Sequence, residues 1–203
     1  RYIVQCWIDG FTRANKDYRI KKTASIIVPC GMELLGRLVD NELEKIGIQG
    51  QFIVPYKVYE NKQLNYDHRF DSALILDRDY TTMAINVYAE VVDDIQELIK
   101  GDAGPVCIEL FGETPFSPVV KNSVLTLNKE QQELSREMMS KTAQIYYQYY
   151  KREQNSFCII AFPSPEIGDK FPEIFADTLK INLLDSNHYA VIQQKIIDVL
   201  DKA

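Results

Sequence analysis

The chain has 203 residues, of which 46% are hydrophobic and 26% are charged, a composition typical of a folded globular protein. This length is sufficient for one well-buried domain. With 29 acidic and 23 basic side chains the net charge is −6, which disfavours binding to the phosphate backbone of a nucleic acid. No apolar run approaches the length that crosses a bilayer, so we expect no membrane association.

The four cysteines are far apart in the sequence, and none belongs to a Cys-x-x-Cys pair. Three of them, Cys30, Cys107 and Cys158, lie in or beside apolar runs that read as strands; Cys6 is the fourth. This usage favours buried free thiols over disulfides or metal ligands, and therefore predicts a protein of the reducing cytoplasm.

The first half of the chain predicts a strand, a helix and a second strand. Residues 2–12 are mildly amphipathic, but Gly10 weakens the prediction of a helix there. Residues 22–29 form a short β-branched run, residues 32–46 have apolar side chains at helical spacing, and Gly47 follows as a helix stop. Strand character returns over residues 51–59.

The second half predicts long helices between buried strands. The helix over residues 77–101 has Asp77 or Asp79 as its cap, and Asn128 with Gln131 resembles a capping box before a helix that reaches about Arg152. The remaining predicted elements are buried strands over residues 103–111 and 156–162 and a final helix that Asp185 and Ser186 cap.

Continuous apolar strands that alternate with helices indicate an α/β class, with a Rossmann-like, mostly parallel sheet and helices on both faces. We expect strands near residues 23–29, 104–110 and 157–162 to be parallel to one another. The glycine-rich phosphate loops of nucleotide-binding proteins are missing from the sequence, which makes a free-standing nucleotide-binding domain the weakest interpretation.

Other catalytic motifs are missing as well. The sequence has no G-x-S-x-G elbow, and its two histidines, His68 and His188, cannot build an H-E-x-x-H metal motif. His188 lies at the expected start of a helix, where a capping or solvated role is the simpler interpretation.

One short segment concentrates polar groups that could bind a charged ligand end. Its charged members are Asp67, His68, Arg69 and Asp71. The alternative is a loop with local ion pairs that leads into a helix, and the sequence alone favours that alternative.

Three glutamates are placed where open α/β sheets bind ligands. Glu109 interrupts an apolar strand, so it needs a partner or a position that faces a crevice. Glu113 and Glu166 follow the carboxyl ends of two strands, and we expect both to gather with Pro163 at one edge of the sheet. The alternative is that they are solvated loop acids.

Several of these segments resemble the aminopeptidase T and aminopeptidase S family of metallo-exopeptidases. The strand over residues 157–161, followed by Phe162-Pro163-Ser164-Pro165, is similar to the strand and Pro-x-Pro signature of that family. The runs 66–74, 103–113, 156–168 and 193–198 add to a resemblance that covers about residues 21–203. Many members follow the signature with a small residue and tryptophan, whereas this chain has Glu166-Ile167.

The resemblance implies a Rossmann-like accessory domain over residues 21–203, with residues 1–20 as the tail of a preceding helical region. It also implies a C-terminal catalytic domain that carries two divalent metal ions and releases N-terminal amino acids from short peptides. No catalytic or metal-binding residue of the family maps onto this chain. The residues that would form the wall of the cavity are Asp67, His68, Arg69, Asp71, Glu109, Glu113, Pro163, Pro165 and Glu166.

The chain begins at Arg1 and stops at Ala203 within a predicted helix, so we expect a piece of a longer polypeptide. Its partners would be its own catalytic domain and short peptides, and homo-oligomerisation is left open. The alternative function is a non-catalytic binding or assembly module that kept the fold. Two glutamates, two histidines and an aspartate in the sequence after Ala203 would favour the enzyme.

Overall fold

The computed structural model describes residues 2–14, 18–53, 61–183 and 185–202. It confirms the α/β class and the predicted parallel sheet, which has four strands, all parallel. The chain divides into two compact units, which we describe separately. The first unit comprises residues 1–56, 102–114 and 153–203, and the second comprises residues 57–101 and 115–152.

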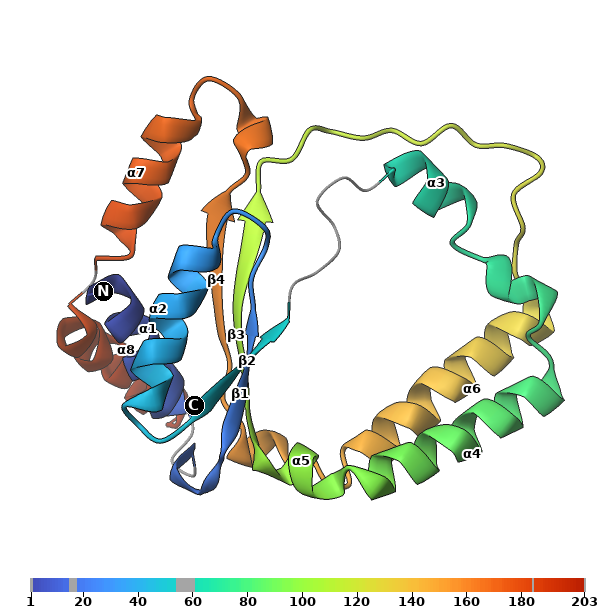
Figure 1. The fold of residues 1–203 in the computed structure, drawn as a ribbon, viewed down its shortest axis with the longest axis horizontal. Coiled ribbons are helices and arrows are strands. Elements are labelled where there is room, and N and C mark those ends of the chain that lie inside the picture. The colour runs from blue at the N-terminus through green and yellow to red at the C-terminus, as the bar shows by residue number, and fades with distance from the viewer. Residues whose placement is uncertain (1, 15–17, 54–60, 184, 203) are drawn as a thin grey trace. The chain divides into compact units, whose positions relative to one another are not determined.

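The sheet belongs to the first unit and has the order β2-β1-β3-β4 (Figure 1). The three pairs of neighbouring strands are all parallel, which confirms the prediction made from the apolar runs. The strands are β1 (Thr23–Ile27), β2 (Gln49–Ile53), β3 (Asp102–Phe111) and β4 (Cys158–Pro163). The predicted strand over residues 51–59 begins two residues earlier, and its part from 54 onward lies outside the described residues.

Helices α1 (Tyr2–Ala14), α2 (Glu33–Glu44) and α7 (Phe171–Ile181) pack on the same side of the sheet (Figure 1). Their apolar faces meet the side chains of Ile26, Val106 and Phe162 in one core. Helix α2 ends as its sequence predicts, because Gly47 takes a positive φ of 81° that favours glycine. Helix α8 (Ser186–Leu200) is capped by Asp185, whose carboxylate accepts hydrogen bonds from the N–H groups of residues 187 and 188.

Helix α1 is more regular than its sequence suggests. It runs through Gly10, where no neighbouring atom lies within 4 Å of the position that a Cβ would take. Burial of Val4, Trp7, Ile8 and Phe11 in the core outweighs the low helix propensity of one glycine, which is about 1 kcal/mol. The sequence predicts a boundary after residue 20, whereas α1 shares its core with the sheet of the first unit.

The opposite face of the sheet carries exposed side chains. Ile53 on one edge strand is 48% exposed and Ile159 on the other is 56% exposed, with the exposed Glu109 on β3. The sequence predicts helices on both faces of the sheet. In the first unit, helices α1, α2 and α7 cover the face that carries Ile26 and Phe162.

The second unit consists of helices and a long loop. Helix α4 (Arg78–Asp94) packs against α6 (Lys129–Tyr146), and the unit also contains α3 (Lys62–Asp67) and α5 (Gln96–Gly101). The predicted caps are confirmed, because Asp77 accepts from the N–H of Tyr80 and Asn128 forms a capping box with Gln131.

Two helices in this unit are shorter than predicted. The helix over residues 77–101 is interrupted at Ile95, where α4 ends before α5 begins. Helix α6 stops at Tyr146 rather than near Arg152. Four tyrosines between residues 146 and 150 follow its apolar face, and bulky aromatic side chains lose rotational freedom in a helix.

Candidate functional site

The carboxyl ends of β3 and β4 lie side by side in the first unit. Phe111 pairs with Pro163 in the register of the two strands, and the N–H of Ser164 donates to the carbonyl of Phe111 at 2.7 Å. Pro163 is fully buried and Ser164 is only 5% exposed, so the segment Pro163-Ser164-Pro165 begins inside the core and reaches the surface at Pro165. These contacts fix where the two following loops start.

A hydrogen bond joins the two loops beyond the strands. The Glu166 carboxylate accepts from the N–H of Thr114 at 2.8 Å, while the Ser164 hydroxyl oxygen accepts from the N–H of Glu166 at 3.2 Å. Pro165 opens the short 3₁₀ turn Pro165–Ile167 that carries Glu166. Glu113, Pro163 and Glu166 therefore lie at the same edge of the sheet, as parallel strands predict.

Gly112 determines how closely the loops approach. It has a φ of 79°, and a Cβ at this residue would lie 2.7 Å from the Cδ1 atom of Ile167. Both the backbone conformation and the close contact favour glycine here. The Glu166-Ile167 pair thus has two roles in the structure: Glu166 accepts a hydrogen bond from the loop after β3, and Ile167 packs against that loop.

Glu109 is exposed on β3, where it pairs in register with Ala161. Its neighbour on the same face, Cys107, has a raised pKa because of burial and because of the nearby Glu109 charge. Burial raises the pKa of Cys158 to about 11. Both cysteines are free thiols and stay protonated at neutral pH, which makes them poor nucleophiles and poor metal ligands.

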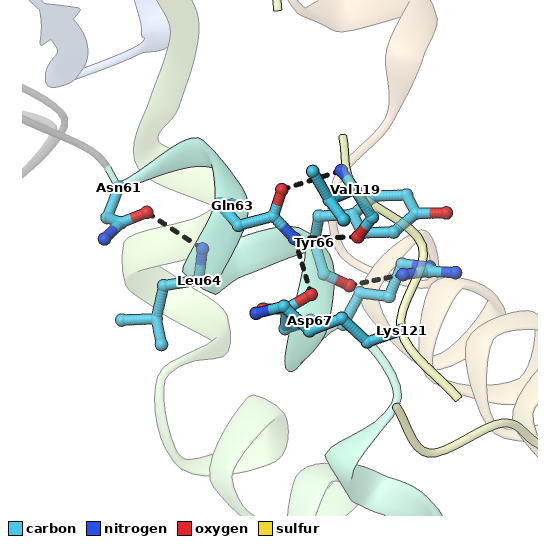
Figure 2. A network of polar contacts seen from close by, with 8 residues as sticks. Asn61, Gln63, Leu64, Tyr66, Asp67, Val119 and Lys121 are labelled. Carbon is cyan, nitrogen blue, oxygen red and sulfur yellow. Dashed lines mark hydrogen bonds and ion pairs between the residues drawn. The ribbon is translucent and has the colours of Figure 1, made fainter. Parts of the chain in front are cut away.

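The polar cluster predicted over residues 67–71 lies in the second unit, at the end of α3 (Figure 2). The Lys121 ammonium contacts the Asp67 carboxylate at 2.5 Å and lowers the pKa of that carboxyl, with a smaller contribution from the Gln63 amide. Asp67 therefore forms an ion pair with Lys121, in the loop between β3 and α6, and this contact occupies the carboxylate that a ligand would need.

Gln63 also joins α3 to this loop, through the backbone of Val119, and the sequence did not predict this contact. Its side-chain oxygen accepts from the N–H of Val119 at 2.9 Å, and its amide nitrogen donates to the Val119 carbonyl at 3.0 Å and to Asp67 at 2.7 Å (Figure 2). The two residues are 56 positions apart. No local pattern marks a glutamine that pairs with a distant backbone, so nothing in the sequence pointed to it.

The other charged members of the cluster also have local partners. A ring nitrogen of His68 lies 2.8 Å from an Asp71 oxygen. The Arg69 guanidinium lies 3.7 Å from the centre of the Tyr66 ring and 4.8 Å from that of Phe70, and it donates to the Tyr66 carbonyl. These contacts favour the interpretation as a loop with local ion pairs over a ligand site.

Among the histidine, cysteine, aspartate and glutamate side chains of the described residues, no group of three or more is arranged to hold a metal ion. The candidate residues form two sets, one at the carboxyl edge of the sheet and one at the end of α3, and these sets belong to different units. The glutamates at the carboxyl edge of the sheet can accept hydrogen bonds and attract a positive charge.

A third polar group, which the sequence did not predict, lies where β1, β3 and β4 begin. Lys21 is only 5% exposed and donates to the Asn155 side-chain oxygen at 3.1 Å, while Asn155 donates to the Asp102 carbonyl at 2.9 Å. Burial raises the pKa of the Asp102 carboxyl. The hydroxyl of Ser156 is buried beside them. This group joins three strand ends and has a structural role.

No family model matches the chain, and no curated protein matches its sequence. Within the part of the chain that the structure describes, none of the helices combines the length and the apolar character that a membrane span requires.

Proposed function

We propose that this chain is an accessory α/β part of a metal-dependent aminopeptidase, and that the metal centre lies in another part of that enzyme. The observation that carries the proposal is the ordered carboxyl edge of the sheet. There the Pro163-Ser164-Pro165 segment, which carries the family resemblance, and the loop after β3 are joined through Glu166 and Thr114.

This edge is suited to form a wall rather than to perform catalysis. Open parallel sheets bind ligands outside the carboxyl ends of their strands. Pro163 and Pro165, the burial of Ser164 between them and a hydrogen bond between the loops restrict the movement of the edge. Glu113 and Glu166 supply negative charge there, which suits the positively charged amino end of a short peptide. The two divalent metal ions and the attacking water would belong to the catalytic part.

We also propose that the protein works in the cytoplasm. The free cysteines Cys30, Cys107 and Cys158 support this, because thiols remain reduced there.

The first test uses the chain as it stands. Isothermal titration with Zn²⁺, Co²⁺ and Mn²⁺ should detect no tight binding of two ions, and leucine p-nitroanilide should not be cleaved. A two-metal site needs several carboxylate or imidazole ligands that hold the ions about 3.5–4 Å apart. Binding of two ions, together with turnover that His68→Ala abolishes, would overturn the accessory role.

The second test uses the enzyme that the proposal requires, in which the chain and the catalytic part belong to one polypeptide. With divalent metal ions it should release N-terminal amino acids from short peptides. Glu166→Ala should change KM for peptides, because the edge loses the hydrogen bond to Thr114, and should leave kcat for leucine amide unchanged. Failure of that polypeptide to cleave any N-terminal residue would contradict the proposal.

A second candidate function, a non-catalytic binding module, is supported by one specific observation. Helix α8 exposes a row of large apolar side chains, among them Ile196 at 56% and Val199 at 67%. A titration that shows partner binding by α8 in a polypeptide without peptidase activity would favour this function over the first.

A further inference from the structure

Helices α1 and α8 form the walls of a groove in the first unit. Its volume is about 640 Å³, which lies in the range of small-molecule sites in proteins. On each helix the lining positions recur at intervals of three or four residues, so each helix presents one face to the groove. The lining residues are Cys6, Trp7, Gly10 and Arg13 of α1, Asn182, and Tyr189, Ala190, Gln193, Gln194 and Ile197 of α8.

Gly10 is the lining residue that packing does not explain. A glycine inside a helix is less favourable than an alanine, and α1 runs through Gly10. Gly36 of α2 is explained by packing, because a side-chain carbon of Val28 lies 2.8 Å from the position that a Cβ would take. At Gly10 no atom of the described residues lies within 4 Å of that position. The space that Gly10 leaves open belongs to the groove.

One wall of the groove is ordered before any ligand binds. The Trp7 indole N–H donates to the Asn182 side-chain oxygen at 3.1 Å, and the Trp7 ring packs against the Phe162 ring at 6.0 Å between centroids. Trp7 is only 6% exposed, so a small part of a fixed ring borders the groove. Tyr189, which is 44% exposed, supplies a second aromatic side chain from α8. These two rings suit the apolar body of a ligand.

The charge of the groove favours an anionic ligand. Arg13 carries the only formal charge among the described residues that line it. Its guanidinium donates to the Asn187 side chain at 3.1 Å, which places the charge beside the start of α8. A guanidinium attracts a carboxylate through its charge and through a planar set of N–H groups that matches two oxygens.

We propose that the groove between α1 and α8 binds a small monocarboxylic acid with an aromatic body. The carboxylate lies at Arg13, and the body lies over Gly10 between Trp7 and Tyr189. The groove shares none of its lining residues with the Glu166 and Thr114 loops at the carboxyl edge of the sheet, so this binding does not depend on the proposed peptidase role.

The test uses the whole chain and three probes that have the same aromatic body. 4-Phenylbutyrate carries a carboxylate, 4-phenylbutyramide is its neutral counterpart, and 4-phenylbutylamine is positively charged. Trp7 is the only tryptophan and lines the groove, so its fluorescence reports binding there. The carboxylate should bind at least about tenfold tighter than the amide, and the amine should bind most weakly. The preference for the carboxylate should shrink as salt is raised.

Substitution of Gly10 separates a binding role from a structural one. Alanine favours the helix, so Gly10→Ala should raise the thermal midpoint by roughly a few degrees. The added methyl group takes space from the groove, so the same variant should bind 4-phenylbutyrate more weakly than the parent chain. Gly10→Leu should abolish binding while the chain stays folded, because the position has no close neighbours.

Substitution of Arg13 tests the charge. Arg13→Gln should lower the affinity for 4-phenylbutyrate to that for the amide, and Arg13→Lys should restore part of the difference. Arg136→Gln makes the same change at an exposed arginine of α6 in the second unit. This matched control should bind like the parent chain.

Three outcomes would overturn the proposal. Equal binding of the carboxylate and the amide, or binding of neither, would show that the groove does not select an anionic ligand. Unchanged affinity in Gly10→Leu would place the probe elsewhere. A lower thermal midpoint in Gly10→Ala would show that the glycine serves the fold and not the ligand.

Discussion

Lys21, Asp102 and Asn155 show how single residues connect the three strands that begin at the same end of the sheet. Gly104 donates its N–H to the Asp102 carboxylate at 3.1 Å, and Lys21 attracts that carboxylate electrostatically. Burial nevertheless has the larger effect, since the pKa of Asp102 is raised above its ordinary value of 3.8. Folding thus disfavours the charged form of this side chain.

Asp102→Asn should reduce the pH dependence of stability. Because the folded pKa is above the unfolded one, the contribution of Asp102 is most favourable below pH 3.8 and becomes less favourable as pH rises through the folded pKa. Asparagine keeps the oxygen that accepts from Gly104 and carries no charge. Urea unfolding at about pH 4 and about pH 7 should therefore show the variant gaining stability relative to the parent at the higher pH. The exposed Asp201→Asn is the control, and a variant that follows the parent at both pH values would contradict the role of burial.

At the scale of elements, the sequence was most informative where apolar runs and caps are local. The strands Thr23–Ile27 and Cys158–Pro163 and the cap at Asn128 follow directly from neighbouring residues. Helix α1 was underestimated because burial of Phe11 and Trp7 against distant strands outweighs Gly10. Helix α6 is shorter than predicted because helical spacing alone does not account for the four crowded tyrosines at its end.

The candidate site was predictable only in part, for the same reason. Parallel strands place their ends together, so the shared edge of Glu113 and Glu166 could be anticipated. The partners of the polar side chains could not. Gln63 and Val119, like Lys121 and Asp67, meet across more than 50 residues of chain, and no periodicity encodes such pairs.

The connection between α3 and the loop at residues 115–121 leads to a prediction at this scale. Gln63→Ala removes the oxygen that accepts from the Val119 N–H, so hydrogen exchange at the Val119 amide should become faster. The Tyr80 amide, which donates to Asp77, should exchange at an unchanged rate. Gln144→Ala, an exposed glutamine of α6, is the matched control. Unchanged protection of Val119 would show that Lys121 and Asp67 suffice to hold the loop.

Acid should weaken the same connection. The Lys121 ammonium keeps the pKa of Asp67 below its ordinary 3.8, so the ion pair stabilises the folded loop above that pH and is lost as pH falls through the lowered pKa. The protection factor of the Val119 amide, which is the exchange rate corrected for its intrinsic dependence on pH, should therefore fall in acid in the parent chain. In Asp67→Asn it should already be lower at neutral pH and should vary less with pH.

At the scale of the whole molecule, each of the two units has its own packed helices. The first unit buries Phe162 completely between Trp7 and Phe175, while the second buries Thr81 and Leu134 where α4 meets α6. The chain crosses between the units several times, since each unit is assembled from separate segments. The two units unfold separately if the core of each one is stable by itself, and together if it is not.

Phe162→Ala tests this independence. Removing a fully buried phenylalanine should destabilise the first unit by about 3–5 kcal/mol, because the cavity that it leaves is not filled. Trp7, the only tryptophan, packs 6.0 Å from the Phe162 ring and reports unfolding of this unit by fluorescence. The urea midpoint of the Trp7 fluorescence change should fall, whereas protection of the Thr81 amide from hydrogen exchange, in the second unit, should stay unchanged. Phe157→Ala, at an exposed position next to β4, is the control. If protection of Thr81 falls together with the Trp7 midpoint, the two units form one cooperative structure, and the contacts that join the segments are stronger than the separate cores suggest.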